Sequence, residues 1–255
     1  MVHGSFFDEI IRNEALDLAN TYNIDLSTRV ACHYISGKEL KLPSNEYALI
    51  RGPEILLTCR IEGVEGQAFT IAPKHYEGEL GDILSIDLSN LFNRGIFYAT
   101  INALTRLAGL IDKSVHCSKD KPVKCGELLV QAIREKYGLS KKILHIGYHP
   151  GHVKELALFL RNNLIVTDLT SNLIWSRKYD IMIYDGLINT QLVGLTDIIL
   201  LTGSSIVNNT MWDILEKAIL LNKKVVVYGV SAIGGITLLR RKIPLDIEVF
   251  CPFAE

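Results

Sequence analysis

Residues 145–152, with the sequence HIGYHPGH, are the first candidates for binding a ligand. An apolar strand is expected to end here and a helix to begin, with two glycines and a proline shaping a tight turn. The free N–H groups at the start of a helix can bind an anion. We therefore expect a ligand to contact Gly147, Tyr148, Pro150 and Gly151. The Gly-x-x-x-Gly spacing does not match the dinucleotide fingerprint, but Asp168 stands about 20 residues after Gly147, where a carboxylate would hold a ribose.

Histidine is frequent in the same turn. His149 and His152 are three residues apart, and imidazole is a common ligand of zinc, nickel and copper. A metal site would take its remaining ligands from elsewhere in the chain, since no neighbouring spacing supplies them. The alternative is that both histidines are plain polar residues of the turn, with His145 directed into the sheet.

Two further polar turns follow apolar strands. The sequence TGSSIVNNT at residues 202–210 carries uncharged hydroxyls and carboxamides, which suit a ligand held by neutral hydrogen bonds or a phosphate on backbone amides. The other turn, GVSAIGG, spans residues 229–235. From these two turns we expect ligand contacts at Thr202, Gly203, Ser204, Asn208 and Ser231. Since the carboxyl ends of parallel strands meet at one rim of a sheet, all three turns are predicted to line one pocket.

No catalytic motif is recognisable. The sequence has no Gly-x-Ser-x-Gly elbow, no phosphate-binding loop of the Gly-x-x-x-x-Gly-Lys type and no His-Glu-x-x-His helix. Asn102 stands on an otherwise apolar helix face, where a buried carboxamide needs partners. It therefore either anchors a neighbouring loop or faces the pocket, and we include it among the candidate ligand-binding residues.

The elements that position these residues form two units. A helix, several short β-rich segments and a second helix predict an α+β unit. Its strands are expected at residues 29–35, 47–51, 55–61 and 67–71. After residue 125, continuous apolar strands alternate with helices, as in a parallel sheet covered on both faces. We expect the boundary between residues 112 and 125, which gives domains 1–115 and 116–255.

The composition excludes several classes of protein. With 27 basic and 28 acidic residues the net charge is −1, so the chain lacks the positive charge of a general nucleic-acid binder. A hydrophobic content of 48% excludes disorder for most of the chain. Charges interrupt every apolar stretch before it could span a membrane, and the first residues lack a signal peptide. We expect a cytoplasmic protein whose five cysteines, none in a Cys-x-x-Cys pair, are buried free thiols.

Residues 197–210, with the pattern Thr-Gly-x-x-x-x-Asn-x-Thr, resemble the carboxyl-terminal domain of a family described as heavy-metal chelation proteins. Upstream, the segment Gly63–Thr70 and the residues from Gly95 to Leu104 resemble the first domain of that family. The resemblance implies an α/β fold, in which an enolase amino-terminal-like α+β domain precedes a Rossmann-like domain with a mostly parallel sheet. It also implies a site in the cleft between the two domains.

Two functions remain open at this point. One is a chelation-related protein that binds a transition metal ion or a metal-bearing small molecule in the interdomain cleft. The other is an enzyme that acts on a nucleotide or an S-adenosylmethionine-like ligand, with Asp168 on its ribose. Because no catalytic acid, base or nucleophile can be recognised, the binding function is favoured. The three turns at the rim of the sheet keep the enzyme hypothesis open. The only further partner to expect is a second copy of the chain, in a homo-oligomer.

Overall fold

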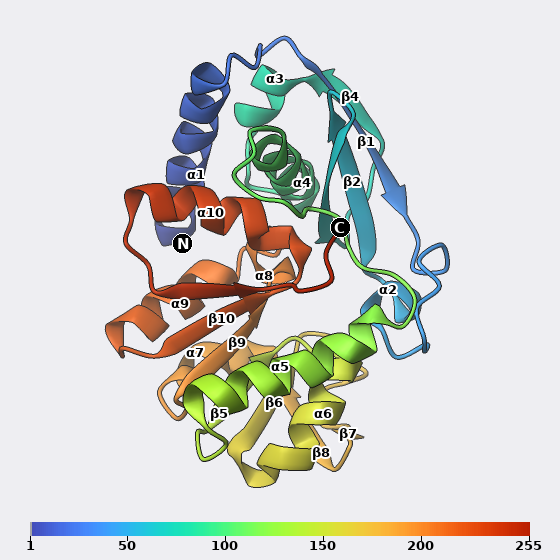
Figure 1. The fold of residues 1–255 in the computed structure, drawn as a ribbon, viewed down its shortest axis with the longest axis vertical. Coiled ribbons are helices and arrows are strands. Elements are labelled where there is room, and N and C mark those ends of the chain that lie inside the picture. Colours follow the sequence, from blue (N-terminus) through green and yellow to red (C-terminus); the bar gives the residue numbers. More distant parts are fainter. Residues whose placement is uncertain (1) are drawn as a thin grey trace.

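A four-stranded antiparallel sheet forms the first unit of the computed structural model, which describes residues 2–255 and the side chains from Phe6 onward. The strands β1 (Arg29–Ile35), β2 (Ile55–Ile61), β3 (Val64–Thr70) and β4 (Tyr76–Glu79) lie in the order β3-β2-β1-β4. The helices are α1 (Val2–Thr21), α2 (Ala48–Arg51), α3 (Leu80–Leu84) and α4 (Leu91–Leu107). Helix α4 packs on β2 and β3, between the sheet and α1 (Figure 1).

A seven-stranded sheet forms the second unit and is parallel except for β7 at its edge. Its strands are β5 (Ile143–Ile146), β6 (Leu164–Asp168), β7 (Arg177–Lys178), β8 (Ile181–Asp185), β9 (Ile198–Thr202), β10 (Lys224–Tyr228) and β11 (Ile247–Phe250). The helices are α5 (Lys121–Tyr137), α6 (Pro150–Leu160), α7 (Asn189–Val193), α8 (Ser204–Val207), α9 (Met211–Leu220) and α10 (Ile233–Lys242). Short 3₁₀ turns lie at Arg161–Asn163, Gly186–Ile188 and Val230–Ala232. The predicted α/β fold, an α+β part followed by a mostly parallel sheet, is confirmed. Among the described residues no helix has both the length and the apolarity to cross a membrane.

The strand order β11-β10-β9-β5-β6-β8-β7 is the doubly wound order. From β5 the chain moves outward through β6 and β8, then returns to β9 on the other side of β5 and continues outward to β11. Numbered along the chain, the six parallel strands read 6-5-4-1-2-3, as in dinucleotide-binding folds. The direction of winding reverses between β5 and β9, so the carboxyl ends of these two strands flank the crevice where such sheets bind ligands.

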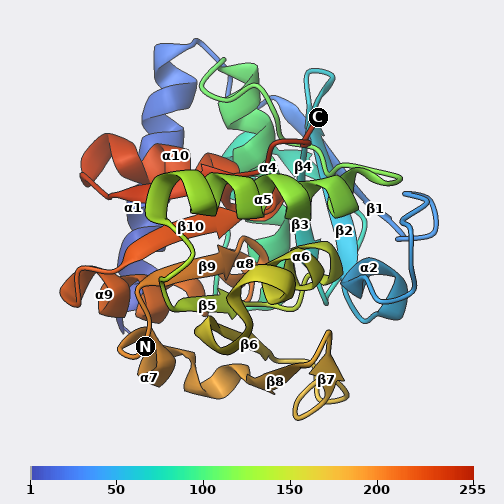
Figure 2. The same cartoon turned by 60° about the horizontal axis from the view of Figure 1, so that its bottom comes forward.

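Alternate residues of the parallel strands face opposite sides of the sheet, because side chains alternate along a strand. Ile143 and Leu200 belong to a core formed with α5 and α6. Leu144 and Leu201 belong to the core on the other face, with α9 and α10. Figure 2 shows α5 and α6 together on one side of this sheet. His145 shares the face of Ile143 and is therefore directed toward α5 and α6.

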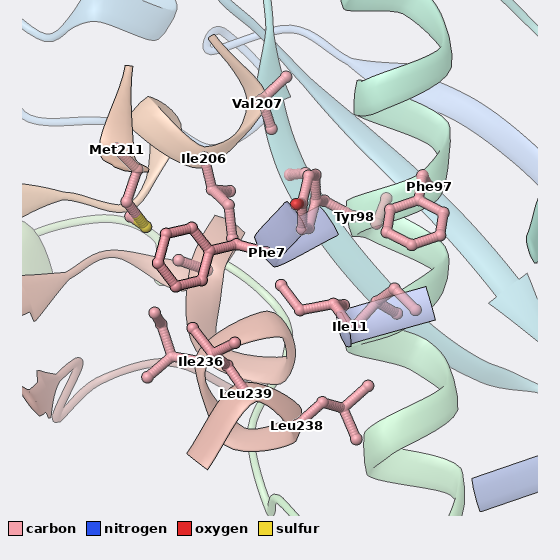
Figure 3. Packing of buried hydrophobic residues seen from close by; sticks show 14 of the residues in the cluster. Phe7, Ile11, Phe97, Tyr98, Ile206, Val207, Met211, Ile236, Leu238 and Leu239 are labelled. Atoms are coloured by element: carbon pink, nitrogen blue, oxygen red, sulfur yellow. The ribbon is translucent and has the colours of Figure 1, made fainter. Parts of the chain in front are cut away.

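The two units share one hydrophobic core. A single cluster of buried residues extends from α1 and α4 of the first unit to α8, α9 and α10 of the second. Figure 3 shows the junction, where Phe7 and Ile11 of α1 lie among side chains of α4, α8 and α10. The division into domains 1–115 and 116–255 stays a prediction about chain organisation, and the core is continuous across it.

Two predicted elements were wrong. Residues 47–51, expected as a strand, contain α2, because the N–H groups of Ile50 and Arg51 donate to the carbonyl of Tyr47 instead of to a neighbouring strand. Gly52 then ends the helix with a φ of 75°, a conformation that favours glycine. The turn expected at 202–210 includes the short helix α8, which the run of Ser and Asn did not indicate.

The expectation of five free thiols was also wrong. Cys32 of β1 and Cys59 of β2 are direct partners in the strand register and form a disulfide. Their spacing in the sequence does not reveal this pairing, because it depends on the register of the two strands. Cys117, Cys125 and Cys251 are free.

A buried ion pair connects the two units. The guanidinium of Arg94, on α4, donates to both carboxylate oxygens of Asp8, on α1, at 2.6 and 3.1 Å. The same guanidinium donates to the carbonyls of Ile206 and Val207 at the end of α8, at 2.6 and 3.0 Å. The Trp212 indole donates to Asp8 at 3.3 Å. Arg94 is only 2% exposed, so each of its contacts replaces water.

We expect Arg94→Met to lower the free energy of unfolding by about 3–5 kcal/mol, because it leaves the Asp8 carboxylate buried without its cation. Urea denaturation followed by circular dichroism measures the change. Arg60→Ala is the matched control: it breaks the surface pair with Glu65, and such pairs contribute about 1 kcal/mol or less. Equal losses in the two variants would contradict the structural role of Arg94.

Candidate functional site

Two adjoining cavities open at the carboxyl ends of the parallel strands, against the first unit. The inner cavity, of about 120 Å³, is bounded by α2, β3, the start of α5, the turn after β5 and the ends of β10 and β11. The outer cavity, of about 490 Å³, is bounded by the ends of β5, β6 and β9 and the segments that follow them. The two form one cleft because six residues line both. These are Glu54, Gly147, Asp168, Thr170, Thr202 and Ser204.

Most of the candidate residues lie in this cleft. The predicted ligand-binding residues that line it are Gly147, Tyr148, Pro150, Asp168, Thr202, Ser204, Asn208 and Ser231. The candidate metal ligands His149 and His152 line the inner cavity. The structure thus brings the first two turns together at one rim. Of the third turn only its first part reaches the cleft, because Gly234 packs against Asn102 and Thr105 of α4.

Gly151 and Gly203, predicted as ligand contacts, are packing residues instead. A Cβ atom on Gly151 would lie 2.4 Å from the carbonyl oxygen of Pro122, and one on Gly126 would lie 2.0 Å from that of Gly151. Helices α5 and α6 therefore cross in backbone contact. A Cβ atom on Gly203 would lie 2.9 Å from the carbonyl oxygen of Gly229. These glycines bring the walls of the cleft together rather than contacting its contents.

Asn102 anchors a loop, the first of its two predicted roles, and does not face the cleft. Its side-chain nitrogen donates to the carbonyls of Gln67, Val230 and Ser231 at 2.8–3.1 Å. Its side-chain oxygen accepts from the N–H of Gly234 at 2.7 Å. The residue is fully buried. One carboxamide therefore holds β3 to the turn after β10, and its inclusion among the ligand contacts is corrected.

The turn after β5 is held by side chains on either side of it. Asp168 accepts the N–H of Tyr148 on one oxygen and that of Thr170 on the other, both at 2.7 Å. His149 is the N-cap of α6, since its Nδ1 accepts the N–H of His152 at 3.2 Å. The Tyr148 hydroxyl donates to Glu46 at 2.7 Å, which joins the turn to the first unit.

A chain of buried polar side chains forms one wall of the inner cavity. Cys125 Sγ of α5 lies 3.3 Å from Nε2 of His152, and His152 Nδ1 lies 3.3 Å from Nε2 of His145. The His149 ring stacks on that of His152 with centroids 3.9 Å apart. Tyr228 packs at their edge and donates to the carbonyls of Ile146 and Gly147. His145 can take part in this chain because its side chain lies on the face of β5 that packs against α5 and α6.

Burial keeps these imidazoles neutral. Desolvation lowers the pKa of His145 and of His149 to about 3, and holds that of His152 well below its usual range. Desolvation also lowers the pKa of His116, another residue that lines the inner cavity, to about 4. At neutral pH each ring therefore offers one donor and one acceptor nitrogen.

The sequence analysis missed several residues of the inner cavity. All three free thiols, Cys117, Cys125 and Cys251, line it. Burial raises the pKa of Cys117 to about 12 and that of Cys251 to about 11, and it raises that of Cys125 as well. Cys117 precedes α5 and Cys125 lies on it, but Cys251 follows β11 at the other end of the second unit, so no spacing pattern could reveal the three as one group.

Glu54 is a second missed residue. It follows the turn Gly52-Pro53 and lines both cavities. Burial, and then the negative charge of Asp168, raise its pKa to about 7, against the opposing effect of Arg51. A carboxyl group with this pKa can donate a proton or a hydrogen bond near neutral pH.

The described residues contain no group of three or more His, Cys, Asp or Glu side chains placed to hold a metal ion. Both ring nitrogens of His152 already have protein partners, and so does Nδ1 of His149. The donor types suit soft and borderline metals.

Comparison with protein families finds one match, over the second unit. Residues 131–236, which run from α5 to the start of α10, match the DUF364 family, described as "Putative heavy-metal chelation". This part of the chain is similar to the DUF364 family. The match contains the turns after β5 and β9 and therefore most of the cleft. No curated protein matches the chain.

Two solved structures of DUF364 proteins, both of unknown function, are similar to this chain. One, from Pyrococcus horikoshii, is 18% identical and has a TM-score of 0.54, with 89% of this chain and 79% of that one covered. The other, from Desulfitobacterium hafniense, is 12% identical and has a TM-score of 0.46, with 85% and 76% covered. The first shows that the fold is shared beyond the DUF364 domain itself.

We expect the stability of the protein to fall as the pH drops from 7.5 to 5. The unfolded histidines have a pKa of about 6.5, above the folded values of about 3 for His145 and His149. The unfolded state therefore binds more protons between these values, and the stabilisation present above pH 6.5 is lost below it, by about 2 kcal/mol per buried histidine at pH 5. Urea denaturation at several pH values measures this slope.

His145→Gln removes one of these groups and should flatten the slope relative to wild type. His75→Gln, at an exposed position, is the control and should leave the slope as it is. Identical slopes in all three proteins would show that His145 is not held neutral by the fold.

Proposed function

We propose that this protein binds a metal-bearing small molecule in the cleft formed by the inner and outer cavities. The observation that carries the proposal is the contrast between the two lobes at the switch point of the sheet. The inner cavity is walled by aromatic rings, neutral imidazoles and thiols. More than half of the residues that line the outer cavity carry a hydroxyl, amide or carboxylate group, and none of them carries an aromatic ring, an imidazole or a thiol. A ligand with one soft or flat part and one polar part matches this division.

The chelation description of the DUF364 family supports the metal part of the proposal. Neutral imidazoles and cysteine sulfurs are ligands of soft and borderline transition metals. No three-donor group is present among the described residues, so the proposed metal arrives with ligands of its own. His149 and His152 are proposed to face its metal-bearing part.

A second candidate, a nucleotide or S-adenosylmethionine-like ligand, is favoured by one specific observation. Asp168 ends β6, next to β5, and lines both cavities. Each of its oxygens accepts one backbone N–H, which leaves acceptor capacity for the two hydroxyls of a ribose. In an enzyme of this kind, the nearby Glu54 carboxyl would be the candidate proton donor.

Ser204→Phe should abolish binding, because Ser204 lines both cavities and a phenyl group there fills the passage between them. We expect untagged wild-type protein to carry a small molecule and its metal, detected by native mass spectrometry and elemental analysis, and the variant to carry neither. Ser140→Phe is the matched control, since Ser140 is exposed in the loop between α5 and β5.

Thermal-shift measurements with nickel, zinc and S-adenosylmethionine separate the two candidates. A shift with S-adenosylmethionine that Asp168→Ala removes, without any effect of the metals, would favour the nucleotide hypothesis. Wild-type protein that carries no molecule or metal, and shifts with none of the three probes, would contradict both.

A further inference from the structure

We propose that Cys125 and His152 together form a two-ligand site for a soft divalent metal ion, which a small molecule in the inner cavity completes. The inference rests on the proposed function and assigns its metal ligands. Cys125 belongs to α5 and His152 to α6, and both line the inner cavity. Neither residue stands out in the sequence as a partner of the other, since 26 residues separate them.

The distance between the two donor atoms suits one ion. Cys125 Sγ and His152 Nε2 are 3.3 Å apart. Two ligands of a tetrahedral ion, with a metal–sulfur distance of about 2.3 Å and a metal–nitrogen distance of about 2.0 Å, lie about 3.5 Å apart. An ion can therefore bind both atoms with little movement of the two helices. This spacing is itself fixed by the backbone contact of α5 and α6 at Gly126 and Gly151.

One tautomer of neutral His152 presents a lone pair to the thiol. A neutral imidazole carries one proton. If Nδ1 of His152 donates to Nε2 of His145, at 3.3 Å, then Nε2 of His152 presents its lone pair to the Cys125 thiol. His145 thus orients a metal ligand from behind, as second-shell partners of metal-bound histidines do. In this tautomer Nδ1 of His145, which is buried and has no partner in the structure, carries the proton of that ring.

Metal binding replaces one proton. The S–H bond of Cys125 breaks, the proton passes to solvent, and a metal–sulfur bond forms while Nε2 of His152 donates its lone pair. No electron is transferred. One thiolate leaves one positive charge on a divalent ion, so an anionic donor from the small molecule would neutralise it in this buried cavity. This requirement explains why two protein ligands suffice, and why the described residues hold no third donor in place.

The other two thiols of the cavity lack this arrangement. The imidazole of His116 contacts the backbone carbonyl of Cys117 rather than its sulfur. For Cys251 the structure records no contact between its sulfur and an imidazole among the described residues. Cys125 is therefore the thiol that the fold pairs with a nitrogen ligand.

Cadmium is the probe, because a cadmium–thiolate bond absorbs in the ultraviolet and reports one sulfur ligand directly. We expect wild-type protein, in a non-thiol reductant, to bind one Cd²⁺ with the absorption of a single thiolate. Cys125→Ser, which is nearly isosteric, should lose the absorption and weaken binding at least about tenfold. The Cys117→Ser/Cys251→Ser double variant should retain it. Thermal unfolding of each variant shows that it is folded.

Two controls complete the test. His152→Asn should keep the thiol but weaken Cd²⁺ binding in competition with a chelator, whereas Glu127→Gln, at an exposed position on α5, should bind like wild type. Retained absorption in Cys125→Ser, or its loss in the double variant alone, would overturn the assignment.

The outcome is separable from that of the proposed function. If wild type shows no cadmium–thiolate absorption but still carries a small molecule that Ser204→Phe removes, the cysteine–histidine pair is not a metal site and the cleft function stands. If cadmium binds as expected but no molecule occupies the cleft, the metal ligands stand and the small-molecule proposal fails.

Discussion

The ion pair between Arg94 and Asp8 is the interaction on which the rest of the structure depends. A guanidinium removed from water needs its charge and its donors matched, and Arg94 meets this need with one carboxylate from α1 and two carbonyls from the end of α8. Helix α8 begins at Ser204, in the wall of the cleft. The hydrogen bonds from Arg94 to the end of α8 join the two units, and they therefore also set the position of this side of the cleft. The shared apolar core around Phe7 then makes this arrangement rigid.

A second constraint is the close approach of α5 to α6. Only glycine at positions 126 and 151 allows the two backbones to touch, and this contact places Cys125 beside His152. The helix contact therefore holds this imidazole and this thiol in position. Desolvation lowers the pKa values of the neighbouring buried histidines, so their rings are neutral. Burying a net charge beside such a wall is unfavourable, which is the physical reason for proposing a metal complex rather than a free ion.

The outer cavity has a different character. Asp168, Thr170 and Thr202 present oxygen atoms at the ends of β6 and β9, where the reversal of strand order opens the sheet. Glu54 enters from the first unit, and its pKa is raised first by burial and then by the negative charge of Asp168. The first unit thus contributes a carboxyl group to the wall of a crevice that the parallel sheet provides.

The sequence by itself determined most of the order of elements, the parallel character of the second sheet and the rim on which the turns after β5 and β9 lie. Apolar strands, such as Ile198–Thr202, and the polar turns after them are local patterns, and the carboxyl ends of parallel strands must share an edge. Only the tertiary structure decided that Asn102 is an anchor, that Cys32 pairs with Cys59, and that Cys125 meets His152. Each of these contacts joins residues whose separation in the chain carries no information, because strand register and helix crossing, not spacing, bring them together.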